Sequence, residues 1–313
     1  MIAIVNPAAG AGHCRSRWHS FVAFLQRRTH QFSHDFKIET RWTESPGDAM
    51  DLASRAVSQR PDLILAVGGD GTVHEVINGL LRASEPSTVP VPIGILPFGR
   101  GNDYADMLRI PRRIPDLFNL LQQSTFASFD VGVVECFNTA GQRTVQYFNN
   151  ILGLGFDARV AARMNRLNRR LPWAIAYPIN ILRELTNLHF YPMNVIINGQ
   201  TLELTSFLFV IAIGKSFGGG LRVAPNADPQ DGRFDVIWAD PIPRHQVIRL
   251  LPRVYRGRHL THPTIHAGTA TEITINSETA VPIEAEGEVI GWTPAHITIQ
   301  PRRLTVCVPS NLS

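Results

Sequence analysis

Cysteine and lysine are scarce in this chain of 313 residues. The three cysteines, Cys14, Cys136 and Cys307, lie far apart and show neither CxxC nor Cys/His ligand spacing, which argues against a disulfide framework and against a zinc site. Lys37 and Lys215 are the only lysines, so the other 28 of the 30 basic residues are arginines. The guanidinium group binds phosphate in a bidentate way, so this excess suits a phosphate-bearing ligand.

Long hydrophobic runs are also missing. The longest, residues 207–213, is far shorter than the roughly 20 residues that a membrane-spanning helix needs. Residues 1–6 have the pattern of a strand and a turn, and they lack the charged and apolar regions of a signal peptide. We therefore expect a cytoplasmic protein that is either free in solution or bound to a membrane surface.

The overall composition is that of a folded protein. Hydrophobic residues make up 44% of the chain and charged residues 18%, which is too apolar for a disordered protein. At roughly 150 residues per domain, the length allows about two domains. The net charge of +4 suits an acidic partner but falls short of what a nucleic-acid-binding protein needs.

The first 125 residues alternate short β-rich runs with longer helical patterns. Strands are expected at 2–5, 36–42, 63–67 and 93–96, and helices at 14–30, 47–59, 72–82 and 114–123. Strands that alternate with helices form right-handed crossovers and a mostly parallel sheet. The sequence therefore predicts an α/β N-terminal domain over residues 1–128.

Short strands dominate the remainder of the chain. They are expected at 130–135, 145–151, 193–197, 206–213, 233–238, 271–275 and 296–299, with helical inserts at 158–188 and 244–256. Strands of this kind pack as an antiparallel sandwich or barrel. We expect a β-sandwich C-terminal domain over residues 129–313, whose last strand can pack back on the first domain.

The strongest motif is the run Ala66-Val67-Gly68-Gly69-Asp70-Gly71-Thr72-Val73-His74-Glu75, in which an apolar strand ends in glycines and a helix begins. Such a turn exposes backbone N–H groups to a phosphate, and the helix dipole favours the negative charge. Asp70 is expected to face solvent, where it can hold a magnesium ion or orient phosphates. The alternative is an ordinary strand-to-helix turn with Thr72 as the helix cap.

Two further loops follow strands in the same half. Residues 5–12 contain Asn6-Pro7 and two glycines, and residues 96–104 contain Gly99-Arg100-Gly101-Asn102-Asp103. Loops at the carboxyl edge of an open parallel sheet converge in one crevice. Neither loop is a Walker motif or a dinucleotide-binding GxGxxG motif, and each by itself would be a plain turn.

Several motifs together resemble a known family. They are Asn6-Pro7, Gly69-Asp70-Gly71-Thr72 with Glu75, Pro97 to Asp103, Phe129-Asp130-Val131-Gly132, Phe148-Asn149-Asn150, Gly218-Gly219-Gly220 and Asp231-Gly232-Arg233-Phe234. In this order, and over nearly the whole chain, they resemble the diacylglycerol kinase catalytic-domain family of bacterial lipid kinases, which is related to sphingosine and ceramide kinases. The resemblance implies a nucleotide-binding α/β domain, a β-sandwich, and a cleft between them where ATP meets a lipid hydroxyl.

The resemblance also implies the residues that bind ATP. They are Asn6, Pro7, Ala8, Ala9, Gly10, Thr43, Gly69, Asp70, Gly71, Thr72, Val73, His74, Glu75 and Arg100. Thr43 by itself has the pattern of a cap or turn residue. Arg100 stands where the family usually has a threonine, so it either clamps phosphate or blocks the usual nucleotide pose. A lysine that often ends the first loop in the family is absent, and His13 and Cys14 lie there.

A magnesium site of structural character is implied in the second domain. It would use the Asp231 carboxylate, with Asp228 and Arg233 contributing through backbone oxygens, and oxygen ligands suit a hard cation. An ordinary Asp-Gly hairpin turn remains the alternative.

The family's catalytic base is the aspartate of an Asp-Gly-Glu motif, and this chain has Glu286-Gly287-Glu288 there. Glu286 can accept the proton of the attacking hydroxyl, but its longer side chain moves the carboxylate, and phosphoryl transfer depends on positioning. A solvated hairpin is the alternative for this segment.

Arginine spacing points to a membrane surface. Arg159, Arg163, Arg166 and Arg170 share one arc of a predicted helix, beside an apolar arc, and the apolar segment 171–178 contains two interfacial aromatic residues. A second row, Arg249, Arg253 and Arg256, adds to this pattern. The alternative is a solvated helix face.

The leading hypothesis is an ATP- and Mg²⁺-dependent lipid kinase, acting on diacylglycerol or a related lipid and bound peripherally to anionic membranes. An NAD kinase or a phosphofructokinase-like soluble kinase is one alternative. A catalytically weak lipid-binding regulatory protein is another, because of Arg100 and Glu286. No nucleic-acid partner is expected, and the oligomeric state stays open, with a homodimer as one option.

Overall fold

In the computed structural model, residues 1–29, 37–85, 88–123, 125–166 and 173–310 are described. The chain divides into two compact units. Unit 1 comprises Met1–Phe129 and Arg302–Ser313, and unit 2 comprises Asp130–Pro301.

Unit 1 contains a parallel sheet. Its strands are β1 (Ile2–Val5), β2 (Glu39–Trp42), β3 (Ile64–Gly68), β4 (Ile93–Pro97) and the end of β15 (Glu288–Cys307). The strand order is β2-β1-β3-β4-β15, and every pairing in it is parallel. Three of these strands, β1, β3 and β4, are buried along their whole length, as strands covered on both faces must be. The predicted α/β class of the N-terminal domain is confirmed.

Helices follow the strands of this sheet. They are α1 (Cys14–Thr29), α2 (Asp48–Val57), α3 (Asp70–Ala83) and α5 (Ile114–Gln123), with two short elements that the sequence analysis did not predict, η1 (Ala9–Gly12) and α4 (Asp103–Met107). Helices α2 and α3 pack closely because Gly79 has no side chain. A Cβ atom there would lie 2.0 Å from the carbonyl oxygen of Met50.

Unit 2 is built from antiparallel strands. They are β5 (Phe126–Phe137), β6 (Arg143–Phe148), β7 (Ile151–Gly155), β8 (Tyr191–Ile197), β9 (Gln200–Ser206), β10 (Leu208–Ala212), β11 (Phe234–Ala239), β12 (Ile265–Ala270), β13 (Glu272–Asn276), β14 (Pro282–Ala285) and most of β15. The β-rich character of the second domain is therefore confirmed. The single strand predicted at 145–151 is wrong, because the chain turns at Asn149-Asn150 and continues as a separate strand.

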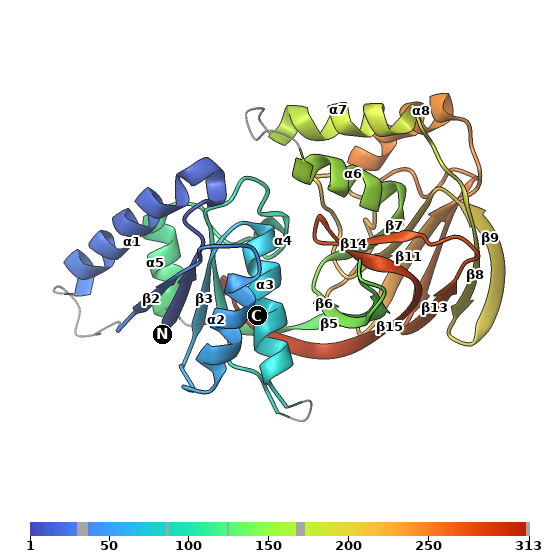
Figure 1. The fold of residues 1–313 in the computed structure, drawn as a ribbon. Helices are drawn as coiled ribbons and strands as arrows, with labels where there is room; N and C mark the ends of the chain where they lie inside the picture. Colours follow the sequence, from blue (N-terminus) through green and yellow to red (C-terminus); the bar gives the residue numbers. More distant parts are fainter. Residues whose placement is uncertain (30–36, 86–87, 124, 167–172, 311–313) are drawn as a thin grey trace. The chain divides into compact units, whose positions relative to one another are not determined.

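Two hydrophobic clusters fill unit 2. One lies among the strands and includes Phe148, Phe209 and Phe234. The other lies under three helices, α6 (Phe156–Arg166), α7 (Trp173–Leu185) and α8 (Arg244–Tyr255), which Figure 1 shows on one side of the strands. The helical insert predicted at 158–188 is thus two helices, and residues 167–172 between them lie outside the described part of the chain.

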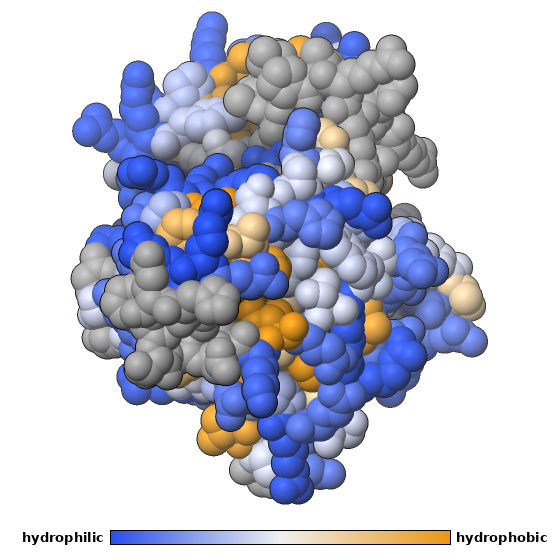
Figure 2. Space-filling view, turned by 90° about the vertical axis from the view of Figure 1, so that its left-hand side faces the viewer, coloured by the Kyte–Doolittle hydropathy of each residue, from blue (hydrophilic) through white to orange (hydrophobic). Residues whose placement is uncertain are grey.

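Large apolar side chains are mostly covered. Those that remain exposed among the described residues are Val89, Phe126, Val145, Leu182, Phe190, Leu202, Ile248 and Tyr255. The face drawn in Figure 2 is accordingly hydrophilic over most of its area, with hydrophobic residues in small patches. Of the helices in the described ranges, none is long and apolar enough to cross a membrane.

Candidate active site

Three loops of unit 1 touch one another at the carboxyl edge of the sheet. Asn6 Nδ2, after β1, donates a hydrogen bond of 3.0 Å to Thr72 Oγ1 at the start of α3. Gly99, after β4, approaches Gly69 so closely that a Cβ atom on it would lie 2.2 Å from the Gly69 Cα. Gly10 has φ +60, and a Cβ there would lie 2.4 Å from the carbonyl oxygen of Phe98. The predicted convergence of these loops therefore depends on glycine at two of these three contacts.

The start of α3 lies in the middle of this loop cluster. The helix begins at Asp70, directly after β3 and the extended N-cap residue Gly69. The first N–H groups of a helix have no partner inside it and form the positive end of its dipole. Helix α3 is 14 residues long, so its dipole makes this N-terminus a suitable place for a phosphate group.

The Asp70 side chain is half-buried and engaged in hydrogen bonds, whereas the sequence predicted that it faces solvent. Its Oδ2 accepts a 2.6 Å hydrogen bond from Asn102 N, and its Oδ1 accepts one of 3.2 Å from Tyr104 N. Burial raises the pKa of Asp70, and these backbone hydrogen bonds oppose that shift. Asp70 therefore fastens the loop after β4 to the start of α3.

Side chains on the first turns of α3 also point inward. The Glu75 carboxylate accepts hydrogen bonds from Gly47 N (2.9 Å) and Ala49 N (3.1 Å), so it caps the N-terminus of α2. His74 is buried, and burial lowers its pKa to about 4, which keeps the ring neutral. Val73 is buried as well. Of the predicted nucleotide contacts, these three can contribute only main-chain atoms or an indirect role.

The other predicted contacts lie around the same edge. Thr43 follows β2, is buried, and donates its backbone N–H to the carbonyl of Val5 (3.0 Å). Ala8 N donates to Asn6 Oδ1 (3.0 Å), which fixes the first loop. Arg100 is exposed on the loop after β4.

Glu286 in unit 2 occupies a strained turn. Glu286 and Gly287 join β14 to β15, where Ala285 pairs with Glu288, and their φ angles are +54 and +85. A two-residue hairpin loop of this kind favours asparagine or glycine, and a glutamate with positive φ is uncommon. Its Oε1 accepts hydrogen bonds from Asn149 N (3.1 Å) and Asn150 N (2.7 Å). The predicted base is thus a carboxylate held at a fixed position, and it is not a freely solvated hairpin side chain.

Asn149 and Asn150 belong to this site, although the sequence analysis gave them no role. Both are buried, and Asn150 Nδ2 donates to the carbonyl of Ser216 (3.1 Å). Their Oδ1 atoms are buried and accept no hydrogen bond from the described residues. Two buried acceptors next to a fixed carboxylate can receive hydrogen bonds from a ligand. The break between β6 and β7 is what places them there.

A pair of buried carboxyl groups lies beside the same turn. Asp157 Oδ2 and Glu284 Oε1 lie close together, because both are within 3 Å of where a Cβ atom on Gly153 would be, and Gly287 N donates to Glu284 Oε2 (2.8 Å). Both of these oxygens are buried and have no hydrogen-bond partner within the described ranges. Burial raises the pKa of both groups. The negative charges of Asp157 and Glu286 raise the pKa of Glu284 further. One proton held between them satisfies both oxygens.

Glu284→Gln should make the stability of the protein less dependent on pH. The folded wild type keeps a proton that the unfolded chain loses above about pH 4, so its stability falls as pH rises toward the raised pKa values, by up to about 1.4 kcal/mol per pH unit. Glutamine can accept from Gly287 N and donate to Asp157, so the variant needs no such proton. Thermal melts between pH 5 and pH 8 measure the difference, and the exposed Glu288→Gln serves as control. Equal slopes in all three proteins would contradict the shared proton.

The predicted magnesium loop is ordered by its own side chains. Asp228 Oδ1 accepts from Gln230 N (3.1 Å), and Asp231 Oδ1 accepts from Arg233 N (2.9 Å). No group of three His, Cys, Asp or Glu side chains in the described ranges is placed to hold a metal ion, but the expected site needs one carboxylate and main-chain oxygens. Burial, followed by the Asp231 charge, raises the pKa of Asp235. Oxygen donors and excess negative charge fit Mg²⁺.

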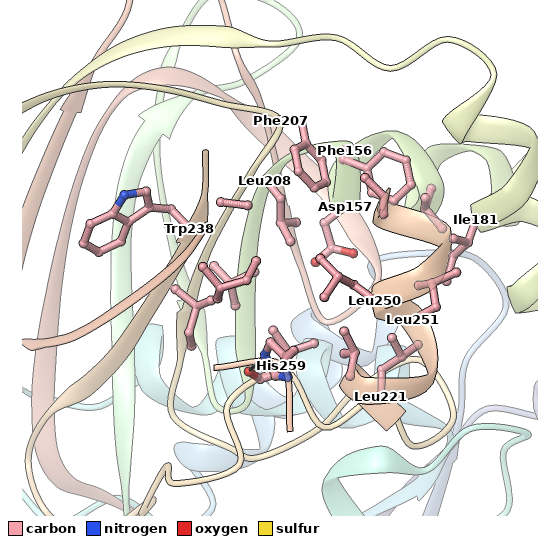
Figure 3. A pocket seen from close by; sticks show the side chains of 18 of the residues that line it. Phe156, Asp157, Ile181, Phe207, Leu208, Leu221, Trp238, Leu250, Leu251 and His259 are labelled. Atoms are coloured by element: carbon pink, nitrogen blue, oxygen red, sulfur yellow. Dashed lines mark hydrogen bonds between the residues drawn. The ribbon is translucent and has the colours of Figure 1, made fainter. Parts of the chain in front are cut away.

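An apolar pocket lies under the three helices of unit 2. Its walls come from β10, β11, α6, α7 and α8, and Figure 3 shows Leu250 and Leu251 of α8 along one side. Asp157 and His259 bring polar atoms to a lining that is otherwise almost entirely hydrophobic. His259 Nε2 lies 2.9 Å from the carbonyl oxygen of Val223, and burial lowers the pKa of the ring. A lining this hydrophobic suits an acyl chain.

Comparisons with known proteins agree with the two units. The sequence model of the diacylglycerol kinase catalytic domain matches residues 1–134, and that of the YegS C-terminal NAD kinase beta sandwich-like domain matches residues 150–308. A diacylglycerol kinase of Mycobacterium tuberculosis is 28% identical over 311 residues, which cover 98% of this chain and 94% of the relative.

Solved structures show the same fold. A diacylglycerol kinase structure from Bacillus anthracis has a TM-score of 0.72 at 22% identity and covers 100% of this chain and 97% of its own. Yeast NADH kinase in complex with NADH has a TM-score of 0.55 at 14% identity, over 99% of this chain and 83% of its own. The likeness to the NADH kinase is the more distant of the two.

Proposed function

Because this chain belongs to the lipid kinase family that joins a diacylglycerol kinase catalytic domain to a YegS-type C-terminal domain, we propose that it transfers the γ-phosphoryl group of ATP to the hydroxyl of diacylglycerol or a related lipid. The fixed carboxylate of Glu286 is the observation that supports this proposal most directly. A glutamate at positive φ is costly for a plain turn, and two backbone N–H groups fix the carboxylate of this one.

Glu286 acts as the general base in this proposal. It accepts the proton of the lipid hydroxyl while that oxygen forms a bond to the γ-phosphorus, the bond from the phosphorus to the β–γ bridging oxygen breaks, and ADP leaves. The N–H groups of Asn149 and Asn150 donate to the carboxylate and so fix its orientation. The buried Oδ1 atoms of these two residues can accept hydrogen bonds from the hydroxyl groups of the lipid.

The nucleotide, as its magnesium complex, is assigned to the loop cluster of unit 1. Main-chain N–H groups at the start of α3 would receive its phosphates, since a helix N-terminus favours anions. Asn6 and Thr72 hold the two neighbouring loops together by their mutual hydrogen bond. Arg100, exposed on the third loop, is in reach of solvent and can bind phosphate as a bidentate donor.

A structural Mg²⁺ is assigned to the loop of Asp228, Asp231 and Arg233, where it would stabilise the chain just before β11. Asp231→Asn should weaken it, because asparagine keeps the hydrogen bond to Arg233 N but loses the ligand charge. The melting temperature of the wild type should rise with added magnesium, and that of the variant should rise less. Asp62→Asn, an exposed change in unit 1, is the control. An identical magnesium response in wild type and Asp231→Asn would place the ion elsewhere.

The lipid substrate is assigned to the apolar pocket of unit 2, with its acyl chains among the hydrophobic side chains under α6, α7 and α8. A substrate of this kind resides in membranes, so we also propose that the enzyme associates with them peripherally.

The helix α6 is a weaker candidate for that membrane contact than its arginine spacing predicts. Arg159 Nε and Arg163 Nε donate to Glu184 of α7 at 2.6 and 2.9 Å. The Arg166 side chain, residues 167–172 with Arg170 among them, and the side chains of residues 173–177 lie outside what the structure describes.

Phosphorylation of a total lipid extract tests the function. Labelled ATP, magnesium and the extract in neutral detergent micelles should yield a labelled lipid, and mass spectrometry then identifies it. Parallel reactions with NAD and with fructose 6-phosphate should yield no label in product. A labelled soluble product without a labelled lipid would support the NAD kinase or phosphofructokinase-like alternative. Lipid binding without turnover would support the regulatory alternative.

A further inference from the structure

Helix α8 and the loop after it contain basic residues but no acidic residue. Residues 241–271 contain no aspartate or glutamate. The same segment contains five arginines, all exposed: Arg244, Arg249, Arg253, Arg256 and Arg258. None of the five forms an ion pair with any residue in the described ranges, whereas the α6 arginines Arg159 and Arg163 share Glu184. The segment therefore presents unneutralised positive charge.

The helix has two outward rows side by side. Arg249, Arg253 and Arg256 follow each other at intervals of four and three residues, and so do Ile248, Pro252 and Tyr255. Ile248 is 44% exposed and Tyr255 37% exposed. Together with Leu251 and Arg256, the members of the apolar row line a shallow hollow on the surface. An exposed apolar row beside a basic row is typical of helices that lie in a membrane interface.

The remaining face of α8 forms part of the pocket wall. Val247 and Leu250 are buried, and Leu251 and Val254 also line the pocket. Figure 3 shows α8 with its leucines directed at the pocket interior. One helix thus separates the apolar pocket from solvent, and its outer surface combines positive charge with exposed hydrophobic side chains.

We propose that the outer face of α8 docks the protein on an anionic lipid bilayer, with Ile248 and Tyr255 entering the boundary between headgroups and acyl chains and the arginines on lipid phosphates. This inference rests on the proposed function, because docking through α8 brings the wall of the lipid pocket to the bilayer that holds the substrate. A bilayer explains both rows, because phosphates meet the arginines and acyl chains meet the apolar row. A nucleic acid would explain the charge but would leave Ile248 and Tyr255 without an apolar partner.

Vesicle co-sedimentation tests the docking directly. The full chain is mixed, without nucleotide, with one of two kinds of vesicle. Neutral vesicles contain phosphatidylcholine alone, and anionic vesicles contain phosphatidylcholine with about 30% phosphatidylglycerol, which gives the surface a negative potential. The wild type should bind the anionic vesicles at least tenfold better than the neutral ones. About 0.5 M salt should weaken this binding, because the Debye length is then only roughly 4 Å. Arg249→Glu with Arg253→Glu should reduce the binding at least tenfold. Ile248→Ser with Tyr255→Ser should reduce it even at low salt.

The control has the same charge change elsewhere. Arg27→Glu with Arg143→Glu replaces one exposed arginine in each unit and should leave vesicle binding unchanged. Equal binding by the α8 charge variant and the wild type, each with the same melting temperature, would overturn the proposal. Preference for a single-stranded RNA over the anionic vesicles would overturn it in favour of a nucleic-acid partner.

A micelle assay separates this inference from the proposed function. The α8 charge variant should phosphorylate lipid in neutral detergent micelles as fast as the wild type, because Arg249 and Arg253 do not line the pocket. A wild type that phosphorylates no lipid in micelles would refute the proposed function, while the vesicle result would still decide the docking surface.

Discussion

Glu286→Gln should lower kcat by about 100-fold or more and leave nucleotide affinity nearly unchanged. The glutamine amide oxygen can still accept from Asn149 N and Asn150 N, so the turn keeps its geometry. The amide cannot take the proton of the attacking hydroxyl, so the base alone is lost. Initial rates with labelled ATP and lipid micelles measure kcat, and equilibrium dialysis measures nucleotide binding.

Two further variants make this test specific. Glu288→Gln changes an exposed glutamate two residues away and should do much less harm. Glu286→Asp restores the family's usual residue but shortens the reach to the two N–H donors, so it should keep partial activity. An inactive Glu288→Gln beside a fully active Glu286→Gln would reverse the roles. Full activity in both would mean that the base lies elsewhere.

Asp70→Ala should reduce kcat/KM by at least tenfold, which corresponds to about 1.4 kcal/mol or more of transition-state stabilisation. Without the carboxylate, the N–H groups of Asn102 and Tyr104 lose their acceptors, and the loop after β4 is no longer fastened to the start of α3. The nucleotide would then meet a loop cluster of altered shape. Steady-state kinetics and a thermal melt together report both effects.

Asp70→Asn separates the charge from the hydrogen bonds. Its amide oxygen can replace one of the two acceptors, so its activity should fall between those of the wild type and Asp70→Ala. Asp51→Ala removes an exposed carboxylate from α2 and should change neither rate nor stability appreciably. Unchanged kinetics in Asp70→Ala would argue against a phosphate-binding role for the whole loop cluster.

Local patterns in the sequence were enough for the fold class. β1 matches its predicted bounds, and β3 and β4 agree within one residue, because an apolar run between turn residues is a local signal. The loops after these strands could be paired in advance since parallel strands end at one edge. The short elements η1 and α4, and the break at Asn149-Asn150, had no periodic signal to reveal them.

Chemistry at the site depended on partners far away in the sequence. Asp70 has the residue type and the motif of a cation ligand, but Asn102 N, 32 residues later, takes its Oδ2. Glu75 caps α2, whose Gly47 precedes it by 28 residues. The Arg159 and Arg163 row binds Glu184, 25 and 21 residues later. A sequence pattern shows which groups share a face, but it does not show what packs against that face.

The sequence by itself determined two features: a parallel α/β unit with glycine loops at one sheet edge, and a β-rich second unit. Both follow from short-range periodicity and turn chemistry. The tertiary structure decided that Glu286 is fixed by Asn149, that Arg159 and Arg163 of α6 pair with Glu184, and that the α8 arginines form no ion pair within the described residues. Asn149 and Glu286 are 137 residues apart, and folding alone brings such groups within hydrogen-bond distance, because a hydrogen bond or ion pair depends on separation in space.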